Sequence, residues 1–182
     1  MFDVGELTPE QRLSKAVVNI MSRAYALSGV IMIGDRTVEY DDAKVPTACT
    51  NGRDEWYGKG FLGTLNDAEL RFLVLHEVYH KLYRHLTTWQ HLYKIDPELA
   101  NMSCDFIINI KIYDEYGQDG WVKMPEGGCF DEKYRGWDTA QVFWDLHDNE
   151  PQGEDGRGPG NGDVTGDDPN QGFDSHDWEG AT

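Results

Sequence analysis

The sequence predicts an α+β protein in which a small, twisted, mostly antiparallel sheet packs on three to four helices. Two observations predict this class. Four stretches carry apolar residues at helical spacing behind a capping residue, namely residues 7–29, 65–93, 95–117 and 136–146. Between the first two, residues 30–65 mix β-branched and aromatic residues with Gly, Asn and Asp turn signals, which is typical of three or four short strands.

The first helix has a clear start. Thr8 is a suitable N-cap, Pro9 suits the first helical position, and Gln11 stands at the capping-box position. We expect the helix to end at Gly29 and to bury one face, made of Leu13, Ala16, Val17, Ile20, Met21 and Ala24.

The sheet region contains one strong turn signal, "TNGRD" at residues 50–54, which predicts a hairpin. We expect residues 54–61, which follow this turn, to form an edge strand along which a peptide substrate could lie by strand addition.

The other helices also carry start signals. Asn66, with Glu69 three residues later, predicts the start of a long helix that continues to Tyr93. Asp96 and Asp138 are the expected N-caps of the two helices that follow.

Composition indicates one domain with two extensions. The chain has 182 residues, of which 39% are hydrophobic and 12% aromatic, enough for one core, which we assign to residues 1–148. Residues 149–172 are rich in Gly, Asp, Asn and Pro and predict a flexible acidic linker. Residues 173–182 regain aromatic residues, so they either dock on the domain or begin a further structure.

Charge and leader signals limit the partners and the location. The net charge is −17, and residues 145–182 contribute 11 acidic side chains against one basic one. Such a surface repels nucleic acids and membranes, and no run of apolar residues is long enough to span a bilayer. The acidic N-terminus lacks a signal-peptide pattern, and the widely spaced Cys49, Cys104 and Cys129 predict reduced thiols. We therefore expect a cytoplasmic protein with no nucleic-acid or membrane partner.

The strongest motif lies within the second helix, in "VLHEVYHKLYRH" at residues 74–85. His76 and His80 are one helical turn apart, so both imidazoles can reach one ion. Glu77 points about 100° away from His76 on a helix, which suits a general base beside the metal rather than a ligand. This H-E-x-x-H pattern predicts a Zn²⁺ site with one ion per chain and peptide hydrolysis by an activated water, and it favours a zincin-like fold.

A catalytic zinc needs a third protein ligand. Asp105 is the stronger candidate, because it shares a helix face with apolar residues, where a buried carboxylate needs a cation or a hydrogen-bond partner. An acidic ligand from the following helix is the gluzincin arrangement. His85 is the alternative, yet it could reach the ion only if the helix broke after His80, and "KLYR" contains no Gly. His85 and Asn109 are therefore candidates for a supporting shell of hydrogen bonds.

The sequence resembles the metallopeptidase domain of the DUF2201 type, which precedes VWA-like domains in bacterial and phage proteins. The resemblance covers residues 8–179 and rests on "TACTNGRDEWYGKGFLGTL", "LNDAELRFLVLHEVYHKLYRH", "NMSCDFIIN", "PEGGCFDEKYRGWDTAQVFWDL" and "FDSHDWE". It implies a zinc metallopeptidase that acts on a peptide or protein, with a VWA-like domain or an AAA ATPase as a partner by association. We expect the VWA-like domain to be absent or reduced in this chain.

Some site roles stay open at the sequence level. Tyr113, Tyr116, His147 and His176 are all candidates for the second oxyanion donor. His176 could alternatively fold back, occupy the open metal position and keep the enzyme latent, or it could simply belong to a docked tail.

Two other functions compete with the enzyme. One is a metal-stabilised, non-catalytic binding module, in which His76 would matter and Glu77 would not. The other is an acidic inhibitor protein that imitates DNA, although its charge gathers in the linker and not on a rigid face.

Overall fold

The computed structural model describes residues 6–149 and 176–181. The elements are, in order, α1 (Pro9–Arg23), η1 (Tyr25–Leu27), α2 (Ser28–Ile31), β1 (Arg36–Glu39), β2 (Ala48–Thr50), β3 (Glu55–Gly58), α3 (Lys59–Thr64), α4 (Asp67–Tyr83), α5 (His85–Thr88), α6 (Gln90–Tyr93), α7 (Pro97–Tyr116), η2 (Glu132–Tyr134) and α8 (Thr139–Asn149). The α+β class expected from the sequence is confirmed. The linker assigned to residues 149–172 lies outside the described residues beyond Asn149, as do residues 173–175.

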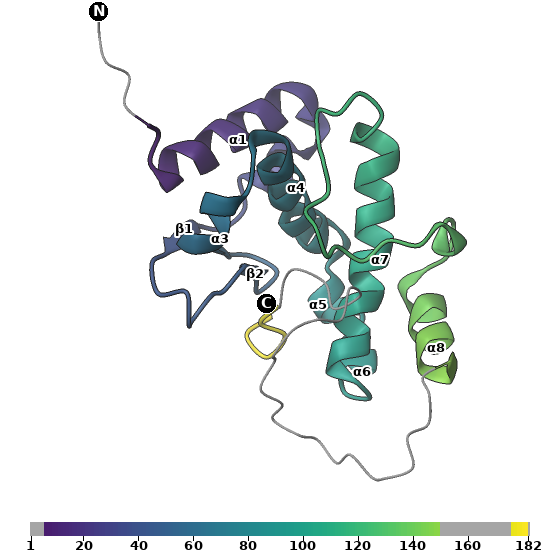
Figure 1. Cartoon of the computed structure of the whole chain (residues 1–182). Helices are drawn as coiled ribbons and strands as arrows, with labels where there is room; N and C mark the ends of the chain where they lie inside the picture. Colours follow the sequence, from purple (N-terminus) through teal and green to yellow (C-terminus); the bar gives the residue numbers. More distant parts are fainter. Residues whose placement is uncertain (1–5, 150–175, 182) are drawn as a thin grey trace, which may run out of the picture.

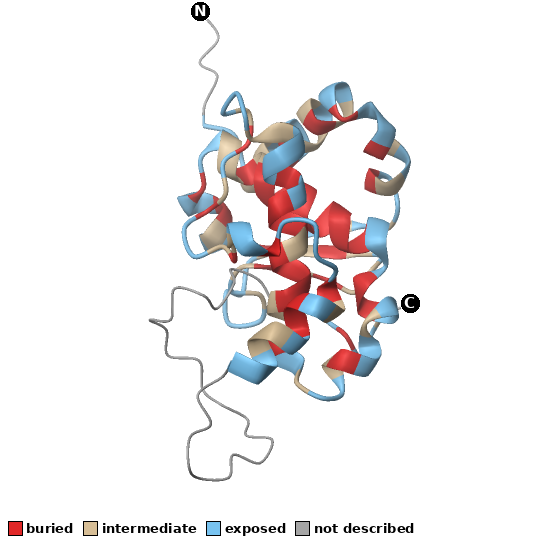
Figure 2. Ribbon diagram, turned by 90° about the vertical axis from the view of Figure 1, so that its right-hand side faces the viewer, coloured by how far each residue is buried: buried red, intermediate tan, exposed pale blue. Residues whose placement is uncertain are grey.

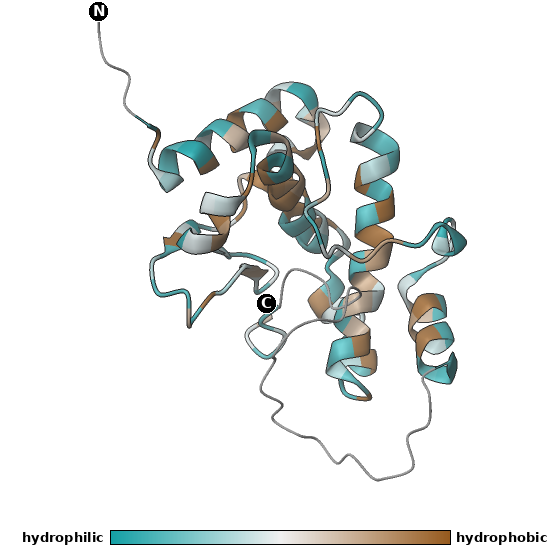
Figure 3. Ribbon diagram, viewed as in Figure 1, coloured by the Kyte–Doolittle hydropathy of each residue, from teal (hydrophilic) through white to brown (hydrophobic). Residues whose placement is uncertain are grey.

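Two crossing helices, α4 and α7, form the centre of the fold (Figure 1). The α1 helix and strand β2 pack against α4, while α6 and α8 pack against α7. Figure 2 shows buried residues concentrated along α4 and α7, and Figure 3 shows the brown, hydrophobic positions on the same helices. Among the described residues, no helix is both long enough and apolar enough to cross a membrane.

The capping residues predicted from the sequence are in place. Thr8 and Asn66 each form a reciprocal capping box, with Gln11 and Glu69 respectively. Asp96 accepts a hydrogen bond from the Leu99 amide at the start of α7. The first helix ends earlier than expected, at Arg23 and not at Gly29, because a 3-10 turn and the short α2 redirect the chain and bring Leu27 and Ile31 into the core.

The sheet has three strands in the order β1-β3-β2. The predicted hairpin joins β2 to β3 as an antiparallel pair, and its turn is closed by the Asn51 side chain, which accepts from the amides of Arg53 and Asp54. Strand β1 pairs with β3 in parallel, so the sheet is mixed and not mostly antiparallel.

The expectation that residues 54–61 form an edge strand was wrong. Strand β3 is central because β1 covers its other side, and both Glu55 and Tyr57 are fully buried there. The free edge next to the central helices belongs to β2, which contacts α4.

The long helix predicted for residues 65–93 is interrupted at Arg84. This residue adopts a left-handed conformation with φ 52° and ψ 42°, and its amide donates to the carbonyls of His80 and Lys81. These bonds satisfy carbonyls that a helix end leaves open, even though a non-glycine residue is unusual in this conformation. The chain then continues as α5 and α6 in new directions.

A buried cluster of charges ties α4 to the sheet. The Glu55 carboxylate, fully buried, receives Arg36 Nε at 2.7 Å and the Tyr57 hydroxyl at 2.6 Å, and it forms an ion pair with Lys81 of α4. Lys81 also donates to the Ile33 carbonyl at 3.0 Å. These bonds hold the end of α4 that follows His80.

Glu55→Gln is expected to lower the free energy of unfolding by about 3–5 kcal/mol, because it leaves the buried Lys81 and the partly buried Arg36 without their carboxylate. Urea denaturation of both proteins measures this difference. The control is Asp41→Asn, which removes an exposed ion pair with Lys44 and should cost less than about 1 kcal/mol. A loss no larger than that of the control would contradict the structural role of the cluster.

Candidate metal centre

Three histidines and one aspartate converge in the interior, where α4 meets α7. His76, His80, Asp105 and His176 each offer one ligand atom, and these atoms all lie within 4.8 Å of one another. The Nε2 atom of His80 is 3.0 Å from Nε2 of His76 and 2.8 Å from Nε2 of His176. Oδ1 of Asp105 is 3.5 Å from the His76 nitrogen, 3.3 Å from the His80 nitrogen and 3.9 Å from the His176 nitrogen.

These spacings fit a tetrahedral cation. Nitrogen and oxygen ligands at zinc bond lengths stand about 3.3 Å apart at the corners of a tetrahedron. The five distances given above fall between 2.8 and 3.9 Å, on both sides of that value. The structure therefore contains a group of side chains that could hold one metal ion.

A bound cation explains the close approach of these side chains better than hydrogen bonds between them do. Nε2 of His80 lies within hydrogen-bond distance of two other imidazole nitrogens, and a neutral ring nitrogen carries at most one hydrogen. A cation can accept lone pairs from all three rings together. It would also offset the charge of the Asp105 carboxylate, which is only 1% exposed.

A hydrogen-bonded amide orients the first ring. Nδ1 of His76 lies 2.8 Å from Oδ1 of Asn109, and the amide nitrogen of Asn109 donates to the Cys129 carbonyl at 3.0 Å. Because the amide nitrogen is engaged elsewhere, the Asn109 oxygen must accept from Nδ1–H of His76. This arrangement places the hydrogen on Nδ1 and turns the lone pair of Nε2 toward the cluster, as in metal-binding histidines.

Glu77 is fully buried beside the cluster. Its Oε2 lies 3.9 Å from Nδ1 of His176. Burial raises the pKa of the Tyr57 hydroxyl, and the charges of Glu55 and Glu77 raise it further. The carboxylate expected to act as a base is thus next to the ligand group on the motif helix.

Asp105 reaches the centre from the middle of α7. The apolar neighbours on its face, Ile108 and Ile112, lie in the core, as the sequence indicated. Asn101, one turn earlier, donates from its amide nitrogen to the second carboxylate oxygen of Asp105 at 3.3 Å. The two side chains can form this bond because residues four apart lie on the same face of a helix, and from the sequence we expect Asn101 to bond either loop backbone or Asp105.

His85 is near the group but not one of its four members. The break at Arg84 removes the geometric objection based on a straight helix, yet the His85 ring packs edge-on against His80 with centroids 5.2 Å apart and stacks on Tyr83. Burial, with smaller contributions from His176 and His76, lowers the pKa of His85 to about 3. The structure therefore shows His85 as a buried ring that packs against His80.

The other candidate oxyanion donors lie elsewhere. Tyr113 packs on Phe130, Tyr116 packs on Trp121, and His147 lies on α8 next to Asp148. In the described part of the chain, none of the hydrogen bonds or ring contacts of these three residues reaches the four-residue group. His176 is the one of the four that the structure brings to the centre.

Three ligand residues on α4 and α7 and a fourth in the C-terminal part of this α+β protein form a group that could hold a metal ion, with the Glu77 carboxylate beside it. The chain belongs to the family described as "putative metallopeptidase domain", whose match covers residues 8–176. This membership confirms the resemblance drawn from the sequence and implies a peptide or protein substrate. No curated protein and no solved structure matches the chain significantly.

Proposed function

We propose that the protein is a zinc-dependent peptidase of the gluzincin type, with Glu77 as the general base. The observation that carries this proposal is the convergence of His76, His80 and Asp105 on one point, with the Glu77 carboxylate buried beside it. These three side chains would hold the ion. When bound, zinc supplies a Lewis acid that polarises a peptide carbonyl and lowers the pKa of a water molecule.

The remaining work falls to the chain's own residues. Glu77 removes a proton from the attacking water and later returns it to the amine that leaves. Asn109 fixes the tautomer of His76, and Asn101 holds the second oxygen of Asp105, so both ligands are oriented before any substrate binds.

One observation favours a second function. His176 adds a fourth ligand atom to the group, and zinc sites with four protein ligands are typically structural, whereas catalytic sites keep one position open. A non-catalytic, metal-stabilised binding module would have such a closed site. In the peptidase, His176 would instead be a ligand that a substrate displaces.

His176→Ala separates these two functions. The peptidase proposal predicts that the variant keeps its zinc and that its hydrolysis of a peptide mixture rises at least about tenfold. This is the change expected if His176 occupies the fourth metal position in about nine wild-type molecules out of ten. Mass spectrometry of the products and elemental analysis of the same samples give both values. His147→Ala, which changes a half-exposed histidine on α8, is the matched control and should change neither.

The outcome that supports the binding module is loss of zinc in His176→Ala. If zinc is retained and neither protein cleaves any peptide in a zinc-dependent way, the peptidase proposal fails.

A further inference from the structure

Residues 176–181, here called the C-terminal segment, lie between the β2 edge and the helices α5 to α7 (Figure 1). The amide of Asp177 donates to the carbonyl of Thr50, the last residue of β2, at 3.1 Å. Because β2 is an edge strand, this bond joins the segment to the sheet as an added peptide would be joined.

The next residue fills an apolar pocket. Trp178 is 3% exposed and stacks on Tyr93 with centroids 4.9 Å apart and planes inclined by 14°. Trp178 belongs to one buried apolar cluster, here called the Trp178 pocket, whose other buried members come from four helices and are Leu86, Leu92, Leu99, Ala100, Cys104 and Phe143. Its polar end is Asn101, whose Oδ1 lies 3.5 Å from Nε1 of the indole. The pocket therefore suits a flat apolar ring with a polar edge.

The pocket and the metal centre are joined through shared residues. Asn101 contacts the indole through its oxygen and Asp105 through its nitrogen. His176 and Trp178 are only two residues apart, on either side of Asp177. One short stretch thus meets the sheet edge, the ligand group and the apolar pocket together.

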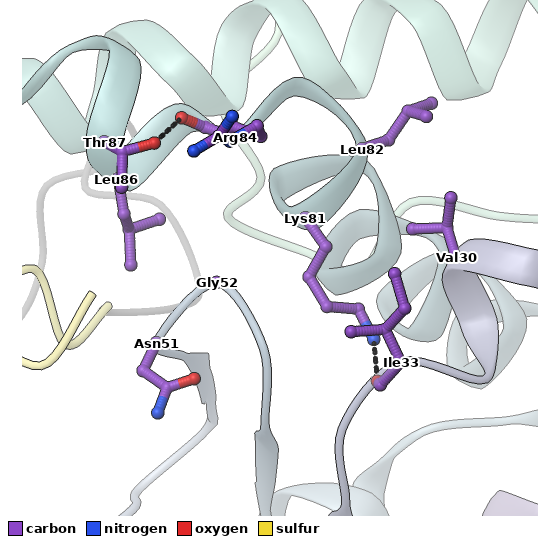
Figure 4. A pocket seen from close by; sticks show the side chains of 9 residues that line it. All are labelled: Val30, Ile33, Asn51, Gly52, Lys81, Leu82, Arg84, Leu86 and Thr87. Carbon is purple, nitrogen blue, oxygen red and sulfur yellow. Dashed lines mark hydrogen bonds between the residues drawn. The ribbon is translucent and has the colours of Figure 1, made fainter. Parts of the chain in front are cut away.

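A cavity lies near the residues that hold the C-terminal segment. A cavity of about 320 Å³ lies between the β2–β3 turn and the end of α4, and Leu86 lines both this cavity and the Trp178 pocket (Figure 4). Asn51 and Gly52, which follow Thr50, form its sheet side. The cavity thus lies directly beyond Thr50, the residue that bonds the C-terminal segment.

We propose that the Trp178 pocket is a side-chain subsite of the peptide-binding groove. It selects a peptide with an aromatic residue two positions after the residue at the metal centre. The C-terminal segment occupies this subsite and so competes with peptide substrates. This inference rests on the proposed peptidase function. Its test measures the affinity for a peptide and not the rate of hydrolysis. The substrate class is a peptide with a Trp or Phe at that position.

The test measures binding of a labelled synthetic peptide with the sequence of residues 174–182, DSHDWEGAT, to the zinc-loaded full chain by fluorescence anisotropy. The receptor is Trp178→Ala, which empties the pocket, and wild type is the comparison. We expect the variant to bind the peptide at least about tenfold more tightly than wild type, because wild type fills its own pocket.

Two altered peptides test the selectivity. Replacing Trp by Phe should weaken binding by no more than about tenfold, the effect of one lost hydrogen bond. Replacing it by Ala should weaken binding by at least about 30-fold, as expected when a buried aromatic anchor is removed. If Trp178→Ala unfolds, as circular dichroism would show, Trp178→Lys serves as the receptor, since it favours release of the segment into water.

Equal affinity for the Trp and Ala peptides, or no binding to either folded variant, would overturn the assignment. Selective binding without zinc-dependent hydrolysis would support the subsite and contradict the peptidase. Hydrolysis without aromatic preference would do the reverse, so the two proposals can fail separately.

Discussion

Asp105→Ala is expected to weaken zinc binding by more than about 100-fold, beyond the 10- to 100-fold loss typical of residues that only support a ligand. The carboxylate is the one anionic ligand in the group and contacts three imidazole nitrogens at 3.3–3.9 Å. Its removal takes away a ligand atom as well as the charge that offsets the cation. Competition with a chromogenic chelator measures the affinity of each protein.

Asn109→Ala is the matched comparison on the same helix. It leaves every proposed ligand in place but removes the acceptor for Nδ1–H of His76 and the donor to the Cys129 carbonyl, so its loss should fall within about 10- to 100-fold. If Asp105→Ala keeps its affinity within tenfold while His85→Ala loses it, then the third ligand is His85, and the ligand set proposed above is wrong.

Glu77→Gln is expected to reduce peptide hydrolysis by about 10²- to 10⁴-fold, the usual contribution of a general base. Glutamine has almost the same shape and cannot accept the proton. Because Glu77 is not one of the four ligand residues, the zinc content should not change. Initial rates on a fluorogenic peptide, measured together with zinc content, separate chemistry from metal loss.

Glu98→Gln provides the control for this change, since Glu98 is exposed in the first turn of α7. Its activity should equal that of wild type. A Glu77→Gln protein that keeps both its zinc and full activity would rule out Glu77 as the base and would favour a different proton acceptor.

Local features of the fold could be predicted from the sequence, because their causes lie within a few residues. The N-caps Thr8, Asn66 and Asp96 use side chains that bond to amides two or three positions away. The hairpin after β2 depends on Asn51 and the next three residues in the same way. The convergence of His76 and His80 follows from helix geometry alone.

Other features depend on contacts between distant parts of the chain. The parallel pairing of β1 with β3 joins Arg36 to Glu55, and no local pattern specifies it. No glycine marks the helix end at Arg84, so the sequence pattern predicts a single helix that continues past this residue. His176 meets His80 across 96 positions of sequence, and only the folded chain places them together.

Asp105 stands between these two cases. Its position among isoleucines predicted that a buried carboxylate would need a partner, and the structure places it 1% exposed with Ile108 and Ile112 fully buried. Which partner it meets depends on how α7 crosses α4, which the sequence pattern leaves open. A carboxylate on an apolar helix face was thus a useful sign of a site, while the site's composition required the fold.

The most direct test of a zinc site at His76, His80 and Asp105 is elemental mass spectrometry of the full chain purified without added metal. We predict about one zinc ion per chain in wild type, as expected for one site with this set of ligands. The same measurement should find the ion lost when His76 and His80 are both replaced by alanine. A folded wild-type protein that contains no metal, and takes up none when zinc is supplied, would contradict the account.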